Sequence, residues 1–235
     1  MTGLARAMFC GLLSFAVVMP ALAQATKAKA SAAKVPVIAA AGAVAKGNAV
    51  VGKSKADEER CVECHGHDGH ANDIEDGIGN IGKFPRLAGQ HVEYIVKQFS
   101  EFRSGKRNNE TMSVMAKSVS NADLLDIAAY FSSQKPMQGD GSGDNPIGKN
   151  LFLNGDAARG ILACAGCHTD RVKGAADVSP ENPVIAGQHR RYLQKQLLEW
   201  RAGERRNSPG DVMNKLTKGL TDKEIDALAD YVSGL

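Results

Sequence analysis

Two short motifs in the sequence bring together residues that can do chemistry. Each has two cysteines separated by two residues and followed directly by a histidine: Cys61-Val-Glu-Cys64-His65 and Cys164-Ala-Gly-Cys167-His168. Cys-x-x-Cys-His is the attachment sequence of haem c. Two thiols at this spacing can reach both vinyl groups of one porphyrin and form thioethers. The histidine that follows is then placed to bind the iron.

A single motif of this kind has other interpretations, namely half of a zinc site, a redox dithiol or, in an exported chain, disulfide-bonded cysteines. A structural zinc ion needs four protein ligands, and no second Cys/His pair lies near the second motif. The occurrence of the motif twice favours two covalently bound haem c groups. Their attachment residues would be Cys61, Cys64, Cys164 and Cys167, with His65 and His168 as axial ligands of the iron.

The sequence around the motifs is also repeated. Pro85-Arg-Leu-Ala-Gly-Gln-His91 recurs as Pro183-Val-Ile-Ala-Gly-Gln-His189. Further along, Tyr94, Gln98, Arg103 and Gly105 recur as Tyr192, Gln196, Arg201 and Gly203, and Ser120 to Asp123 as Thr221 to Glu224. The offsets of 103, 98 and 101 residues differ little, so only small insertions separate the copies. A duplication of this kind indicates two similar domains.

Helical patterns dominate both copies. Ile95, Phe99 and Phe102 stand at i, i+4 and i+7, which predicts one face of a helix that ends near Gly105. Leu193, Leu197 and Trp200, followed by Gly203, repeat this pattern. Ser120 with Asp123, and Thr221 with Glu224, predict capping boxes that open a last helix in each copy. The core faces of these helices would be Leu124, Ile127, Ala128 and Phe131, and Ile225, Leu228, Ala229 and Val232. The predicted fold class is all-α, with two tandem domains, each built around a covalent haem.

Each iron needs a second axial ligand, and histidine and methionine are the usual ones in electron carriers; methionine raises the potential relative to a second histidine. The first copy offers Met112 or Met115, and the second offers Met213. Aligning Ser120 with Thr221 places Met112 on Met213, and Met115 on Leu216, which cannot bind iron. We therefore predict Met112 and Met213 as the ligands.

Residues 1–23 have the pattern of a secretory signal peptide. Arg6 is their only charge, an apolar stretch runs over 7–18, and Ala21-Leu22-Ala23 forms a cleavage site. We expect cleavage after Ala23 and a periplasmic protein; the alternative is an uncleaved anchor. Cys10 is removed with the signal, which leaves four cysteines in the mature chain.

Charge is unevenly distributed along the chain. Seven of the 29 basic residues and none of the 26 acidic ones lie in residues 1–55, so 22 basic residues stand against 26 acidic ones after that point. We expect a basic spacer over 24–42, either a solvated tether or a segment that associates weakly with membrane surfaces, and no nucleic-acid partner. The expected domains are 43–135 and 146–235, joined by an exposed linker at 136–145. The first would open with a helix over about 43–60, interrupted at Gly47 and Gly52.

The duplicated motifs over residues 54–235 resemble those of the diheme cytochrome c4 family. The resemblance implies two class I cytochrome c folds with His–Met haems, and an electron carrier rather than an enzyme. It also implies a quinol-oxidising complex or a dehydrogenase as electron donor and a terminal oxidase as acceptor. In that fold a proline carbonyl accepts a hydrogen bond from the axial histidine, and Pro85 and Pro183 match this proline.

Two other functions remain open. The chain could be the cytochrome subunit of a periplasmic dehydrogenase complex. It could instead be a diheme enzyme that acts on peroxide or sulfur compounds, which needs an open iron position or an unusual ligand such as a free cysteine. Because no mature cysteine is spare and both copies offer a methionine, the sequence favours the carrier.

Overall fold

The computed structural model describes residues 47–71, 82–168 and 179–235. The signal segment 1–23, the spacer 24–42 and the first residues of the helix expected from 43 lie outside the described residues. The chain divides after Gly42, and Ala43–Leu235 forms one unit that contains both repeats. No helix within the described residues is long and apolar enough to cross a membrane.

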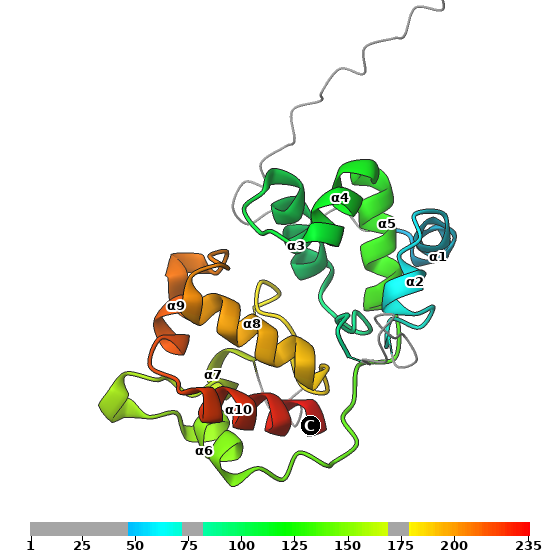
Figure 1. Cartoon of the computed structure of the whole chain (residues 1–235). Helices are drawn as coiled ribbons and strands as arrows, with labels where there is room; N and C mark the ends of the chain where they lie inside the picture. Colours follow the sequence, from blue (N-terminus) through cyan, green and yellow to red (C-terminus); the bar gives the residue numbers. More distant parts are fainter. Residues whose placement is uncertain (1–46, 72–81, 169–178) are drawn as a thin grey trace, which may run out of the picture. The chain divides into compact units, whose positions relative to one another are not determined.

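The described residues are helical, which confirms the predicted all-α class (Figure 1). An isolated bridge between Asp156 and Ile161 is their one β contact. The first repeat contains α1 (Ala49–Glu58), α2 (Val62–His65), α3 (Val92–Ser104), α4 (Glu110–Ser118) and α5 (Asn121–Ser132). The second contains α6 (Pro146–Asn154), η1 (Ala157–Arg159), α7 (Ala165–His168), α8 (Arg190–Ala202), η4 (Pro209–Asp211), α9 (Val212–Thr217) and α10 (Asp222–Gly234).

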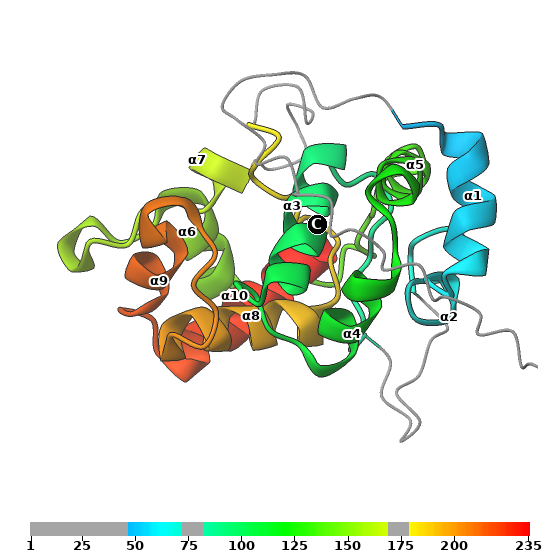
Figure 2. The same cartoon turned by 90° about the horizontal axis from the view of Figure 1, so that it is seen from above.

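The first and last helices of each repeat pack against each other: α1 lies beside α5, and α6 beside α10 (Figures 1 and 2). A glycine stands at each crossing. A Cβ at Gly52 would overlap the carbonyl of Asp126, and a Cβ at Gly148 would overlap that of Ala227. The expected interruption at Gly52 was therefore wrong. The helix begins after the Asn48 cap and continues through Gly52, because the missing side chain lets two backbones approach closely.

The predicted amphipathic helices are confirmed. Ile95, Phe99 and Phe102 of α3 are buried. On α8, Leu193 is buried, whereas Leu197 and Trp200 are half-buried. Both helices end at a glycine in the left-handed conformation, Gly105 at φ 77° and Gly203 at φ 78°. All eight predicted core residues of α5 and α10 are also buried. They form the centres of two apolar clusters, one in each repeat.

The two predicted capping boxes differ. At Thr221 both bonds form, since its hydroxyl accepts from the Glu224 N–H and the Glu224 carboxylate accepts from the Thr221 N–H at 2.9 Å. At Ser120 only the first forms, because the hydroxyl accepts from the Asp123 N–H and donates to the Asp123 carboxylate instead. Aspartate is one methylene shorter than glutamate, so the capping box predicted at Ser120 was wrong in its reciprocal bond, and only the Ser120 N-cap forms.

The segment 136–145 is less exposed than expected. Met137 is fully buried, and Gly139 and Gly141 donate backbone hydrogen bonds to Leu235 and Gly234 at the end of α10. A stretch rich in Gly, Asp and Ser was predicted to be solvated throughout. The prediction failed at Met137, the one large apolar side chain of the segment. It also failed at Gly139 and Gly141, where the absence of a side chain lets the backbone lie against the end of α10.

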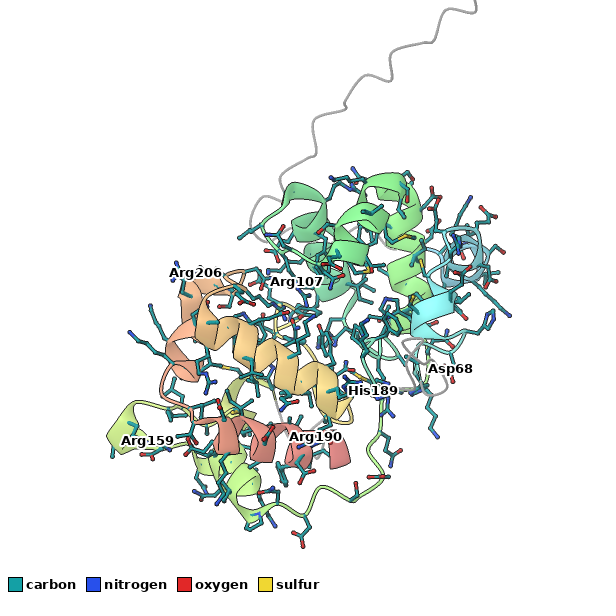
Figure 3. The ribbon with its side chains drawn as sticks, in the orientation of Figure 1. Asp68, Arg107, Arg159, His189, Arg190 and Arg206 are labelled. Atoms are coloured by element: carbon teal, nitrogen blue, oxygen red, sulfur yellow. The ribbon has the colours of Figure 1, made fainter. Side chains whose placement is uncertain are left out.

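Two buried arginines, Arg107 and Arg205, join the repeats; Arg107 is labelled in Figure 3. Arg107 donates to Gln98 Oε1 at 2.6 Å and to Gln196 Oε1 at 2.7 Å. Arg205 donates to the same two oxygens at 3.0 and 2.5 Å. Each guanidinium also lies over an aromatic ring of its own repeat, Arg107 over Phe102 and Arg205 over Trp200. Each glutamine oxygen therefore accepts a hydrogen bond from one arginine of each repeat.

Candidate haem-attachment sites

Each Cys-x-x-Cys-His motif forms one helical turn. The His65 N–H donates to Cys61 O at 3.0 Å, and the His168 N–H donates to Cys164 O at the same distance. Residues at i, i+3 and i+4 share one face of a helix. Both thiols and the imidazole of a motif therefore lie on the same face, which is what attachment to one planar ring requires.

The axial histidines have a fixed ring orientation. His65 Nδ1 lies 2.9 Å from the carbonyl oxygen of Pro85, and His168 Nδ1 lies 3.0 Å from that of Pro183. A carbonyl can only accept, so Nδ1 carries the proton and Nε2 is left with the lone pair that binds a metal. Burial lowers the pKa of both imidazoles and outweighs the proline carbonyls, which act in the opposite direction. Both rings are thus kept neutral, as a ligand must be.

The four cysteines are not disulfide-bonded. Burial, with a smaller contribution from Glu59, raises the pKa of the Cys61 thiol to about 11, and burial raises that of Cys164 to about 11. Both side chains pack against the apolar cluster of their own repeat. These surroundings suit a thioether, which carries no charge, better than a reactive thiolate.

Met112 and Met213 occupy related but not identical positions. Met112 is the third residue of α4, and its N–H donates to the side chain of Asn109 at 2.9 Å. Met213 is the second residue of α9, and its N–H donates to the Ser208 hydroxyl at 3.1 Å. Both side chains are partly buried. In each repeat a polar side chain thus fixes the backbone from which the methionine projects.

An arginine at the end of α3 and of α8 holds the segment that carries each methionine. Arg103 donates to the carbonyl oxygens of Ala116 and Val119, both at 2.7 Å. Its counterpart Arg201 donates to Leu220 O at 2.9 Å. These carbonyls lie at the ends of the methionine-bearing segments, where a helix leaves its last carbonyls unpaired. The recurrence of Arg103 and Arg201 was visible in the sequence, whereas their partners were not.

The described residues fit a bound haem in a further respect. Trp200 Nε1 is buried and has no hydrogen-bond partner among the protein atoms described. A buried N–H of this kind is costly unless something else accepts from it. The propionate carboxylates of haem are acceptors of the right type, and Trp200 lies on the predicted inner face of α8.

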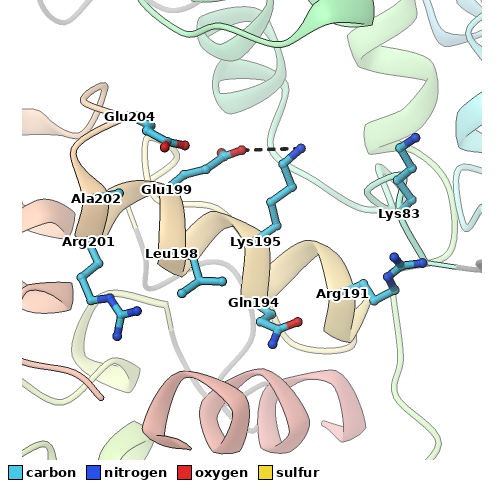
Figure 4. Close-up of a pocket in the computed structure, with 9 residues that line it drawn as sticks. All are labelled: Lys83, Arg191, Gln194, Lys195, Leu198, Glu199, Arg201, Ala202 and Glu204. Carbon is cyan, nitrogen blue, oxygen red and sulfur yellow. Dashed lines mark ion pairs between the residues drawn. The ribbon is translucent and has the colours of Figure 1, made fainter. Parts of the chain in front are cut away.

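A groove of about 680 Å³ follows α8 but is not one of these sites (Figure 4). Lys83, Arg191, Lys195 and Glu199 are among its lining residues, and Lys195 pairs with Glu199 at 3.6 Å. None of the cysteine, histidine or methionine residues discussed above lines it.

Sequence reasoning missed Gln90 and Gln188. Both are buried, with exposed fractions of 3% and 4%, and both form side-chain hydrogen bonds to the backbone of the other repeat. Their recurrence in the Ala-Gly-Gln motif was the only signal in the sequence. It showed that the position was repeated but not which residue it contacted.

Two helical repeats with a haem-attachment turn in each define a diheme c-type cytochrome. A model of the cytochrome c family matches residues 147–235. Cytochrome c4 of Pseudomonas aeruginosa is 38% identical, over 81% of this chain and 90% of that protein. The crystal structure of reduced recombinant cytochrome c4 from Pseudomonas stutzeri superposes with a TM-score of 0.69 at 34% identity, covering 80% of this chain and 99% of that one. The chain belongs to the cytochrome c4 family.

Membership of the family confirms the predicted resemblance, the two covalent haems and the role as an electron carrier. A further relative is named as a thiosulfate dehydrogenase electron acceptor, from Stutzerimonas stutzeri. It is 34% identical, over 74% of this chain and 78% of that protein.

Proposed function

We propose that the chain is a periplasmic carrier that binds its haems through eight residues predicted from the sequence, two of which are oriented by prolines. Cys61 and Cys64 hold the first haem, and Cys164 and Cys167 hold the second. The axial pairs are His65 with Met112 and His168 with Met213, and Pro85 and Pro183 orient the histidines. The observation that carries this proposal is the same Nδ1-to-proline contact in both repeats, at 2.9 and 3.0 Å.

A bound haem supplies a one-electron couple at its iron, and the residues of the chain set the conditions for it. The proline carbonyls keep the proton on Nδ1, so that Nε2 remains free to bind. Asn109 and Ser208 fix the backbone at the two methionines, and Arg103 and Arg201 hold the segments behind them. These contacts would hold the histidines and methionines in place when haem is bound, and so limit the rearrangement on electron transfer.

The domain limits and the location of the protein are part of the proposal. The first domain covers 43–135 and the second covers 146–235. Export rests on the signal pattern of residues 1–23. The basic spacer at 24–42 provides an attraction of about 1 kcal/mol for each basic residue near an anionic lipid surface, screened by salt.

The electron donor is a quinol-oxidising complex or a dehydrogenase, and the acceptor is a terminal oxidase. A second candidate is supported by one comparison. Since a relative of similar length bears the name thiosulfate dehydrogenase electron acceptor, a thiosulfate dehydrogenase is a candidate donor. In that role the chain would serve a periplasmic dehydrogenase as its cytochrome partner.

Two measurements on the purified holo-protein test the proposal. Haem that stays with the protein through acid–acetone extraction, at two per chain, is expected from thioether attachment. A low-spin optical spectrum with a far-red methionine–iron band is expected from His–Met ligation. High-spin iron in the resting oxidised protein would contradict the ligand assignment. Reduction by thiosulfate dehydrogenase with thiosulfate, compared with reduction by a quinol-oxidising complex, distinguishes the two donors.

A further inference from the structure

The side chains of Gln90 and Gln188 each form a pair of hydrogen bonds with the backbone of the other repeat. Gln188 Oε1 accepts from the Arg86 N–H at 2.8 Å, and Gln188 Nε2 donates to Arg86 O at 2.9 Å. Gln90 Oε1 accepts from the Val184 N–H at 2.9 Å, and Gln90 Nε2 donates to Val184 O at 2.9 Å. We call these the two amide pairs.

Each amide pair includes the peptide group that contacts an axial histidine. The carbonyl of Pro85 and the N–H of Arg86 belong to one peptide group, and that carbonyl accepts from His65 Nδ1. The same holds for Pro183, Val184 and His168. A path of two hydrogen bonds and one peptide group therefore leads from each imidazole to a glutamine of the opposite repeat.

The turns that carry the glutamines leave them little freedom. Gly89 and Gly187 have φ of 67° and 72°, a conformation that favours glycine. A Cβ at Gly89 would come within 2.6 Å of Pro136 Cα, and one at Gly187 within 2.7 Å of the Gln138 backbone. Ala88 and Ala186 are also buried. The Ala-Gly-Gln motif thus encodes a close-packed turn that directs an amide at the other repeat.

We propose that Gln188 is a positioning residue for His65 and that Gln90 is one for His168, each tuning the haem of the repeat to which it does not belong. A hydrogen bond accepted from the peptide N–H polarises that peptide group and makes its carbonyl a stronger acceptor. The stronger acceptor pulls the Nδ1 proton and raises electron density on the imidazole. Electron density on this ligand favours the oxidised iron. The inference rests on the proposed roles of His65 and His168 as iron ligands.

The matched variants Gln188→Met and Gln90→Met, made in the full holo-protein, test the inference. Methionine preserves the length of the side chain and removes both hydrogen bonds. The readouts are the Nδ1–H proton resonances of His65 and His168 in the reduced, diamagnetic protein, and the two midpoint potentials. For Gln188→Met we expect an upfield shift of the His65 proton alone. We also expect an increase of about threefold in the equilibrium constant for reduction of one haem, which is about 28 mV for a one-electron couple.

For Gln90→Met we expect the upfield shift at the His168 Nδ1–H proton alone. The increase in the reduction equilibrium constant should then appear at the other haem. A shift at the histidine of the same repeat, equal shifts at both histidines, or no shift at either would overturn the inference. Tyr192→Phe is the control, because it removes a bond between the repeats, from Arg107 at 3.0 Å, without touching either amide pair. It should leave both Nδ1–H resonances in place.

Two further comparisons keep the outcome decisive. If the methionine variants do not retain haem, Gln188→Asn and Gln90→Asn carry the same expectation, because the shorter amide no longer reaches the opposite backbone. Failure of the proposed ligand set would appear in the wild-type protein, as the absence of two low-spin His–Met haems. Failure of the present inference would leave the wild-type spectrum normal and only the crossed pattern missing.

Discussion

The shared environment of Arg107 and Arg205 predicts that their contributions to stability are not additive. Arg107→Met removes three hydrogen bonds, to Gln98, Gln196 and Tyr192, at 2.6, 2.7 and 3.0 Å. At about 1.5–3 kcal/mol for each bond to a charged group, the gross loss is about 4.5–9 kcal/mol. The variant also no longer desolvates a guanidinium, which offsets several kcal/mol. We expect a net loss of about 2–4 kcal/mol in the free energy of unfolding.

The double variant Arg107→Met/Arg205→Met should lose more than the sum of the single variants. In either single variant, both glutamine oxygens still accept a hydrogen bond from the arginine that remains. In the double variant, Gln98 keeps only the Asn207 amide, and Gln196 Oε1 keeps no donor among the described residues. An unsatisfied buried acceptor costs about 1–3 kcal/mol. Each single variant also removes the electrostatic repulsion between the two guanidinium groups, but the double variant removes it only once. This too makes the loss of stability in the double variant larger than the sum of the two single losses.

Guanidinium chloride unfolding of the four holo-proteins, followed by far-ultraviolet circular dichroism, measures this coupling. We expect an excess loss of about 1–3 kcal/mol in the double variant. The control is Arg159→Met combined with Arg107→Met. Arg159 pairs with Asp156 and Glu224 and shares no partner with Arg107, so these two losses should add. Additivity of Arg107 and Arg205 within about 0.5 kcal/mol would show that the shared oxygens do not couple them.

Three further predictions concern single positions. Met112→Ala should abolish the far-red band of one haem and lower its potential, whereas Met115→Leu should keep the band, at a packing cost below about 1.5 kcal/mol. Loss of the band in Met115→Leu would assign Met115, not Met112, as the ligand. Gly52→Ala should lower the free energy of unfolding by about 1–3 kcal/mol or more, because its Cβ would overlap a backbone carbonyl of α5. The control Val51→Ala changes an exposed side chain on the same helix and should alter the free energy of unfolding little. The hydrogen bond from Arg159 lowers the pKa of Glu224 to about 2, so about 1 kcal/mol of stability is present above pH 4.5 and is lost as the pH falls towards 2. Chemical unfolding of Glu224→Gln at several pH values should lack this loss.

The sequence alone determined the features that depend on neighbouring residues. The Cys-x-x-Cys-His turn, the apolar face of α3, its end at Gly105 and the start of α10 at Thr221 all follow from contacts within about four residues. The duplication added a second, independent copy of each pattern. Because a covalent haem site needs a local spacing of thiols and imidazole, the cofactor could be predicted before the fold was known.

Only the tertiary structure decided the contacts between distant segments. The sequence pattern predicts an interruption at Gly52, because the role of this glycine depends on how closely α5 approaches. It predicts an exposed Met137, because only the folded chain covers this side chain. Gln90 and Gln188 recur at matching positions, yet no pattern in the sequence identifies the hydrogen-bond partner of either. Side-chain amides can hydrogen-bond with any backbone group within reach, and which group that is depends on how the two repeats pack together.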